Sequence, residues 1–450
     1  MTVIELGDVG AAAPDPEERE KHPEFNPRTW RRVAAIGVTL LCLLVLGASG
    51  LPGPPTVREV WSVRPNAGFA MTVRSDGVFV HQPTRDGSDL VAYDLADGTV
   101  QWRLPFDRQP TYMSLGEEAG LLLIPGDEKS KQIKLEDGST GFVVYGGTTT
   151  AIDARTGQEL WRGRGEVLDA RRDALLFAER GQDSFFSSIW LVRPRDGSIV
   201  WRRDVTATEQ VTVPQDQSSP DRIVTADSQG KVTVVRYADG KVVHEAELPW
   251  SRGTPGFGYS TYLSVTNGLV MTIRQDADRS SLIEAYRLDT LEELWRREAS
   301  AYAFAQGCGP LLCLSEETAV STLEPLTGRP VWQQPGYSGI QLVAEDRVLA
   351  SLPGSASEEQ VLLDLTTGRK IGSGATGWPL QGPAVDGSQI LVRRVLEERR
   401  AYSSISHLDL ETGRVVRIGE IPNADGPQCM SARRYMACDQ AGELTITAVG

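Results

Sequence analysis

Short apolar runs alternate with polar turn residues along most of the chain, and this alternation repeats. The segment Tyr93–Trp102 reads YDLADGTVQW, an apolar run, an Asp-Gly pair and a second run that ends at Trp. The phrase returns seven more times in altered form and ends at residues 161, 201, 244, 295, 332, 372 and 417. Gly in these phrases favours a tight turn because it adopts positive φ without a Cβ clash. Each phrase therefore predicts two short strands joined by a turn, repeated about every 40 residues.

Two more apolar runs precede the phrases, such as Ala301–Ala305 and Leu311–Leu314 before the phrase that ends at residue 332. Four antiparallel strands per repeat predict one blade of a β-propeller. Val57–Val63 looks like a last strand without predecessors, and Gln428–Val449 offers three strands without a fourth. Pairing the two ends would complete a blade and leave no open sheet edge. We expect an all-β propeller of eight four-stranded blades, or nine on the alternative count, closed by its N- and C-terminal strands.

A tryptophan recurs near the last strand of most repeats. Such a large flat side chain buries much apolar area between neighbouring blades. We therefore assign a structural role to Trp61, Trp102, Trp161, Trp201, Trp295 and Trp332.

These repeats resemble the pyrroloquinoline-quinone-like (PQQ-like) β-propeller repeat family, whose repeat reads roughly Ala-x-Asp-x-x-Thr-Gly-x-x-x-Trp. Ala151, Asp153, Thr156, Gly157 and Trp161 match that pattern position for position. The resemblance covers about residues 57–450 and implies a propeller fold. It leaves function open, because the family includes quinone-dependent dehydrogenases, an outer-membrane assembly lipoprotein and binding proteins.

One segment before the repeats is long and apolar enough to cross a membrane. Residues 33–50 carry no charge, and at 1.5 Å per residue they reach about 27 Å. Arg28, Arg31 and Arg32 precede them, so the positive-inside rule predicts a cytoplasmic N-terminus. We expect a disordered cytoplasmic tail (1–32), a transmembrane helix (33–50) and an extracellular propeller (51–450) in the cell membrane. A cleaved signal peptide is the alternative, although the region before the apolar run is long and acidic.

Four cysteines form two pairs that are close in sequence: Cys308 with Cys313, and Cys429 with Cys438. Both pairs bracket the expected turn between the first two strands of a blade, which suits disulfide geometry. Disulfides persist in oxidising compartments, in agreement with an extracellular domain.

Charge and composition exclude some ligands and offer little catalytic chemistry. The net charge is −14, which argues against nucleic acid. The four histidines stand apart from any Cys or Asp at metal-ligand spacing, and no phosphate loop or hydrolase motif appears. The adjacent Cys-Cys pair and the Asp/Asn cluster of the quinone enzymes are also missing from the sequence. We expect no catalytic, cofactor-binding or metal-binding residues and no cofactor.

Three irregular stretches are candidate binding surface. Residues 127–147 lengthen one repeat and hold three of the seven lysines, Lys129, Lys131 and Lys134. Residues 251–262 mix Gly with Phe257, Tyr259 and Tyr262, a composition typical of adaptable contact loops. Residues 183–190 place Phe185 and Phe186 at a strand junction. The alternative is that all three are structural loops.

The sequence thus favours a monomeric, single-pass membrane protein that displays a propeller as a non-enzymatic binding or scaffolding module. Its ligand would be an extracellular protein or a wall polysaccharide. Two alternatives stay open: a quinone- or metal-dependent oxidoreductase with a site in the central channel, and a sensor that signals through its cytoplasmic tail.

Overall fold

The structure is a computed structural model, and it describes residues 56–107, 112–134, 140–214, 221–251, 261–275, 280–354, 358–380, 387–397, 400–422 and 428–449. The expected tail and transmembrane segment, residues 1–50, lie outside these ranges. Within the ranges, no helix is long and apolar enough to span a membrane.

The described chain consists of β-strands, which confirms the all-β prediction. In chain order, the sheets before residue 248 are built from β2 (Ala70–Arg74), β3 (Gly77–Thr84), β4 (Gly87–Asp94) and β5 (Val100–Phe106); β6 (Ser114–Gly116), β7 (Leu121–Lys134), β8 (Thr140–Asp153) and β9 (Glu159–Arg164); and β10 (Glu166–Ala170), β11 (Leu175–Arg180), β12 (Phe186–Val192), β13 (Ile199–Thr212), β14 (Arg222–Asp227), β15 (Lys231–Arg236) and β16 (Val242–Glu247).

The later sheets contain β17 (Thr261–Thr266), β18 (Leu269–Gln275), β19 (Ser281–Arg287) and β20 (Glu293–Ala299); β21 (Phe304–Cys308), β22 (Leu311–Ser315), β23 (Ala319–Leu323) and β24 (Pro330–Pro335); β25 (Gly339–Ala344), β26 (Arg347–Ser351), β27 (Glu359–Asp364) and β28 (Lys370–Thr376); β29 (Trp378–Pro379), β30 (Ser388–Glu397), β31 (Arg400–Asp409) and β32 (Val415–Pro422); and β33 (Gln428–Ala432), β34 (Tyr435–Gln440) and β35 (Glu443–Val449) with β1 (Val57–Val63).

Each four-stranded sheet made of consecutive strands is an antiparallel meander, and one sheet is longer. Strand β13 pairs with β12 through its first half and with β14 from Thr208 to Thr212, so β10–β16 form one sheet of seven strands. Ala207 has φ 45° at the change of partner. No Gly or Pro interrupts β13, and the chain therefore runs from one meander into the next without a loop.

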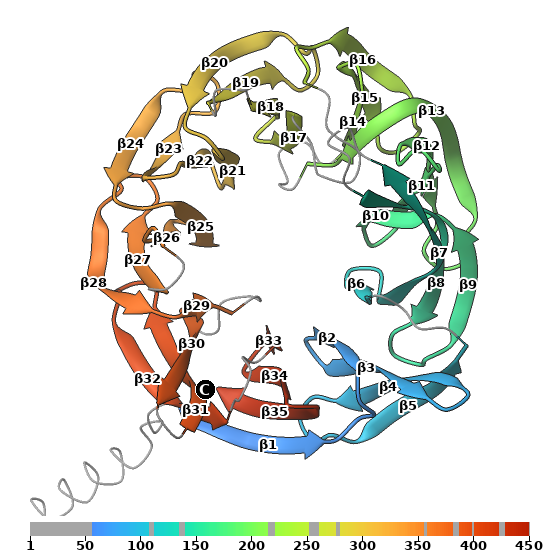
Figure 1. Cartoon of the computed structure of the whole chain (residues 1–450), viewed down its shortest axis with the longest axis vertical. Helices are drawn as coiled ribbons and strands as arrows, with labels where there is room; N and C mark the ends of the chain where they lie inside the picture. The colour runs from blue at the N-terminus through green and yellow to red at the C-terminus, as the bar shows by residue number, and fades with distance from the viewer. Residues whose placement is uncertain are drawn as a thin grey trace, which may run out of the picture. The chain divides into compact units, whose positions relative to one another are not determined.

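The first strand closes the array by pairing with the last one. β1 lies antiparallel to β35, with Val57 opposite Val449 and Val63 opposite Leu444. The predicted closure by N- and C-terminal strands is thus present. Figure 1 shows the sheets from β1 to β35 following one another around a ring, with the first strand of each meander innermost.

The core lies between consecutive sheets. Val224 and Val234 of one meander pack with Val270 and Tyr286 of the next, for example. The same arrangement joins Val78 of β3 to Ile446 of β35 across the closure. Strands buried on both faces explain the continuous apolar runs in the sequence.

Candidate functional site

The strand order gives the ring two unlike faces. In each meander the second and third strands join at one end, and the outermost strand crosses to the next innermost strand at that same end. We call this end the crossover face. The other end, which joins the first strand to the second and the third to the fourth, is the turn face. The repeated Asp-x-x-Thr-Gly phrases all lie on the turn face.

Turn-face aspartates are engaged in holding their own turns. Asp364 Oδ1 accepts hydrogen bonds from the backbone N–H and the hydroxyl of both Thr366 and Thr367, at 2.8 to 3.1 Å. The hydroxyl of Thr367 contributes most to lowering the pKa of Asp364 to about 2. Asp409 repeats the arrangement, and its backbone bond from Thr412 lowers its pKa as well. These carboxylates stay ionised and act as turn caps.

The repeat tryptophans lie between consecutive sheets, over the glycine of the following turn. Trp102 Nε1 donates to Ala154 O at 3.0 Å, and a Cβ on Gly157 would lie 2.6 Å from the Trp102 ring. The other five make the same two contacts, with these carbonyl acceptors and glycines: Trp61 with Leu95 and Gly98, Trp161 with Pro194 and Gly197, Trp201 with Tyr237 and Gly240, Trp295 with Pro325 and Gly328, and Trp332 with Leu365 and Gly368.

One of the seams without tryptophan carries a side chain in place of the glycine, whereas at another, after Gly372, the turn keeps Gly413, where an added Cβ would lie 2.4 Å from Ile371 O. His244 occupies the tryptophan position of its repeat, and the following turn carries Leu291, with φ 51°, where the other turns carry glycine. A side chain is therefore accepted at this turn where no indole lies beneath it. The tryptophan and the glycine form one packing unit.

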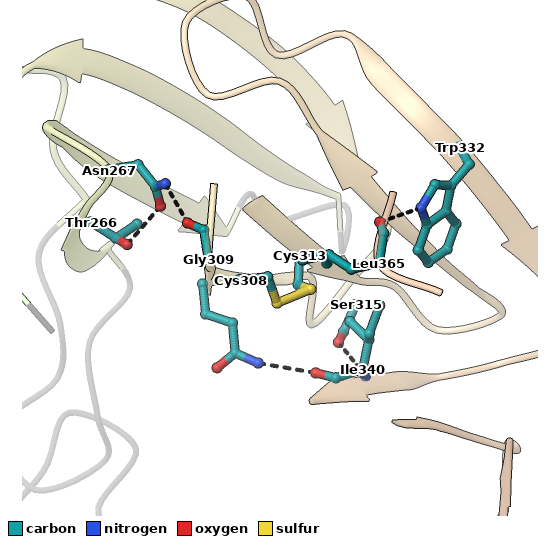
Figure 2. The surroundings of a disulfide bond; sticks show 10 residues. Thr266, Asn267, Cys308, Gly309, Cys313, Ser315, Trp332, Ile340 and Leu365 are labelled. Carbon is teal, nitrogen blue, oxygen red and sulfur yellow. Dashed lines mark hydrogen bonds between the residues drawn. A yellow bond between two sulfur atoms is a disulfide. The ribbon is translucent and has the colours of Figure 1, made fainter. Parts of the chain in front are cut away.

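Both expected disulfides are present and confirm the pairing. Cys308–Cys313 has a Cα–Cα distance of 5.6 Å, and Cys429–Cys438 one of 4.2 Å. Around the first disulfide, Asn267 Nδ2 donates to Gly309 O at 2.8 Å and Gln306 Nε2 donates to Ile340 O at 3.0 Å (Figure 2). These bonds tie the bridged hairpin to the sheets on either side.

The crossover face differs from the turn face in its exposed apolar side chains. Among the described residues, every exposed aromatic side chain lies at the crossover end of a strand or in a crossover: Tyr112, Phe142, Tyr262, Tyr302, Phe304 and Trp378. The exposed apolar residues at the turn end are aliphatic: Val100, Ile199, Val200, Val242, Leu326 and Val331. Aromatic side chains are enriched where proteins bind proteins. The crossover face is therefore the candidate contact surface.

Two innermost strands contribute an aromatic cluster to this face. Tyr262 of β17 and Phe304 of β21 have ring centroids 5.8 Å apart and are tilted by 48°. Tyr302, in the crossover before β21, is 76 % exposed. We call these three residues the aromatic cluster. A partner that covers it would bury apolar area already held on rigid strands.

A long hairpin stands at the same face. Strands β7 and β8 pair from Leu121–Asp153 at the sheet to Lys134–Thr140 at the tip. Lys129, Lys131 and Lys134 are exposed along β7. On β8, Phe142 is 64 % exposed and Val144 is 47 % exposed, and they lie opposite Gln132 and Ser130. We call residues 128–134 and 140–146 the arm.

The remaining predicted contact residues are not all on the surface. Phe186 is buried at 4 % exposure with the Arg180 guanidinium 3.9 Å from its ring centroid, so its assignment as a contact residue is corrected to core. Phe185, next to it, is half-buried. Phe257 and Tyr259 lie outside the described residues.

Sequence reasoning missed Tyr112, Tyr302, Phe304 and Trp378. A signal was available, because each follows the end of a repeat phrase by about ten residues or fewer and precedes or begins the next innermost strand. Alternation alone does not show which end of a strand a residue occupies.

Polar chemistry in the described part of the chain is dispersed. No cluster of three or more His, Cys, Asp or Glu side chains suits a metal ion among the residues that the structure describes. A cavity of about 160 Å³ lies between β13 and β14–β16, and its lining mixes Arg203 and Lys231 with Asp204, Asp227 and Glu245. Lys231 pairs with Glu245 at 3.1 Å, and the mixed charges select neither an anion nor a cation.

The comparisons with known proteins bear on the fold. No curated protein matches the chain. Among solved structures, BamB from Moraxella catarrhalis is 11 % identical with a TM-score of 0.44, and the match covers 87 % of this chain and 99 % of that one. A eukaryotic initiation factor is 10 % identical with a TM-score of 0.53, covering 83 % and 93 %. Sqt1 from Saccharomyces cerevisiae is 12 % identical with a TM-score of 0.42, covering 82 % and 100 %.

At 10 % identity and a TM-score of 0.53, the initiation factor is similar to this chain in fold alone. A family model described as "Outer membrane protein assembly factor BamB" matches residues 86–334, more than half of the sequence. That stretch includes four of the tryptophan and glycine seams and the seven-stranded sheet. The chain belongs to this PQQ-like β-propeller family.

Proposed function

We propose that this chain is a non-enzymatic protein-binding scaffold whose crossover face is the contact surface. The observation that carries the proposal is the segregation of exposed aromatic side chains to that face. A rigid ring presents the ends of many strands side by side, which suits binding of a protein surface. The description of the matched family, an assembly factor, is consistent with a scaffold.

We further propose that residues 33–50 anchor the propeller in the cell membrane and place it outside. The eighteen uncharged residues, the preceding arginines and the two disulfides support this topology. Protease added to intact cells should then cleave the propeller and spare an epitope placed in the N-terminal tail. Protection of both segments from added protease would contradict it.

We also infer nine blades. The seven-stranded sheet supports this count if β13 serves as the outermost strand of one meander and the innermost strand of the next. The seven four-stranded sheets then supply the other blades. An experimental density map of the propeller viewed down its axis would test the number directly.

The scaffold proposal is tested by photo-crosslinking in cells that express the full chain. A photoreactive amino acid is placed at Phe304 or Trp378 on the crossover face, and at Ile199 or Val331 on the turn face as matched exposed controls. We expect protein adducts from the crossover positions and few from the controls. Loss of the adduct at residue 378 on changing Tyr302 and Phe304 to serine would show that the aromatic cluster belongs to the same interface. Equal adducts from both faces would contradict the proposal.

A further inference from the structure

The arm extends beyond the sheet from which it grows. The innermost strand β6 pairs only with Leu121–Leu123 of β7, and the outermost strand β9 pairs only with Thr148–Ile152 of β8. Between these pairings and the tip, the arm is a ribbon of two strands in the described part of the chain. Among the described residues, 140–146 therefore pair with β7 along one edge and with no strand along the other, where Val144, Tyr145 and Gly146 line a small cavity with Glu166 and Arg180.

The two outer edges of the arm are not equivalent. Proteins protect exposed edges with charged side chains, lysine above all. The β7 edge carries Lys129, Lys131 and Lys134, whereas residues 140–146 read TGFVVYG and contain neither charge nor proline. The β8 edge is thus left open to a further strand, while the β7 edge is protected.

The side chains of β8 indicate what such a strand would contain. Phe142 and Val144 lie on one face of the arm, because they are two residues apart, and both are exposed. Their cross-strand partners on β7 are Gln132 and Ser130, which leave the two apolar side chains largely uncovered. Apolar residues on the incoming strand would pair with them across the edge.

The opposite face of the arm favours acidic residues. Lys129 and Lys131 pair across the ribbon with Tyr145, which is half-buried, and Val143, which is 3 % exposed, so the accessible groups on the face away from Phe142 are the two lysine side chains. The whole chain carries a net charge of −14, so its surface repels an acidic segment on average, whereas Lys129 and Lys131 supply local positive charge on this face.

We propose that the β8 edge of the arm, residues 140–146, binds an extended segment of a partner protein as an added β-strand. That segment alternates apolar residues, which contact Phe142 and Val144, with acidic residues, which face Lys129 and Lys131. The inference rests on the proposed scaffold function and names the kind of partner segment that the scaffold holds. Main-chain hydrogen bonds give affinity in this mode, and the alternating side chains give specificity.

The test uses the full chain in detergent and a fluorescent synthetic peptide of alternating Val and Glu. We expect the peptide to bind and to slow amide hydrogen exchange in residues 140–146. The same peptide with N-methyl groups on alternate residues should not bind, because it cannot pair with an edge. A peptide of alternating Val and Lys should bind at least roughly tenfold more weakly.

Two sets of variants separate the parts of the proposal. Changing Lys129 and Lys131 to glutamine should weaken binding of the Val-Glu peptide about tenfold at low salt, whereas changing Lys231 and Lys241 to glutamine should leave it unchanged. Changing Phe142 to serine should also weaken it, without altering hydrogen exchange in β2–β5.

Three results would overturn the inference. The N-methylated peptide could bind equally well, or the Val-Glu peptide could slow hydrogen exchange outside residues 140–146 instead. In the third, the chain does not bind the peptide but forms a concentration-dependent dimer that Phe142→Ser abolishes. The last result would assign the edge to a second copy of the chain. Crosslinks from Phe304 and Trp378 do not depend on the arm, so their persistence would show that the scaffold proposal survives the loss of this one.

Discussion

The tryptophan and glycine seam gives the sharpest test of how this ring is held together. In the structure, Gly328 has φ 65°, and a Cβ added to it would lie 2.5 Å from Cδ2 of Trp295. Trp295 is 8 % exposed, and its Nε1 donates to Pro325 O at 2.7 Å, so packing and this hydrogen bond both fix the position of the indole. The Gly328→Ala change therefore meets a ring that cannot move away without losing buried area.

Gly120 supplies a control, because its backbone has nearly the same φ as Gly328 but no atom lies near the site of an added Cβ. Its φ is 67°, and nothing lies within 4 Å of an added Cβ. Placing alanine in the left-handed region costs about 1–2 kcal/mol at either position. Overpacking against the indole adds about 1–3 kcal/mol at Gly328 alone. Gly328→Ala should therefore lower the free energy of unfolding by about 2–5 kcal/mol, against about 1–2 kcal/mol for Gly120→Ala.

Urea unfolding of the two variants and the parent chain measures this difference as a shift in midpoint at constant slope. A double-mutant cycle with Trp295→Leu completes the experiment. Once the indole is gone, Gly328→Ala should cost no more than Gly120→Ala, which leaves a coupling of about 1–3 kcal/mol. Equal penalties at Gly328 and Gly120, or a coupling near zero, would refute the idea that glycine is present because of the tryptophan.

Three further predictions concern other parts of the ring. Hydrogen bonds hold the pKa of Asp364 at about 2 in the folded chain, below its ordinary 3.8, so its contribution to stability is present above pH 4 and is lost as the pH falls toward 2. The urea midpoint of Asp364→Asn should therefore lie below that of the parent at pH 7 and approach it near pH 2. Changing Cys429 and Cys438 to serine should lower the free energy of unfolding by about 2–3 kcal/mol, because the closed loop is short, and a reductant should then shift the midpoint of this variant less than that of the parent. Trp102→Phe keeps an aromatic ring over Gly157 but leaves Ala154 O without the indole donor. Thermal unfolding should show that the free energy of unfolding falls by about 1–3 kcal/mol, and an unchanged stability would contradict a role for this hydrogen bond.

Local sequence patterns were sufficient for most of the fold. The Asp-x-x-Thr-Gly turns depend on contacts within four residues, as at Asp364, and the Cys308–Cys313 pair spans a single hairpin. The closing pair of β1 and β35 was also predictable, since each end was an incomplete blade. The continuity of β13 was not predicted, because strand patterns show where residues alternate and not where a strand changes partners.

The contact surface was harder to predict than the fold. Phe186 and Phe304 are both aromatic residues at the first position of a strand, yet one is buried in the core and the other is 41 % exposed. Their difference arises from the sheets packed beside them, which no local pattern contains. Lys129, Lys131 and Lys134 could be found because the insertion that carries them breaks the length of the repeat.

The pairing of β1 with β35 also bears on the order in which the chain is made. Among the described strands, residues 57–63 are synthesised first and their partner, residues 443–449, is synthesised last. At about 5–20 residues per second, the first strand waits roughly 20–80 s with an open edge and with Trp61 lacking its own sheet. A chain broken off anywhere before β35 carries the same defect at its beginning, whatever the break point. Protection of β1 thus depends on completion of β35, and an incomplete chain offers proteases an unpaired first strand.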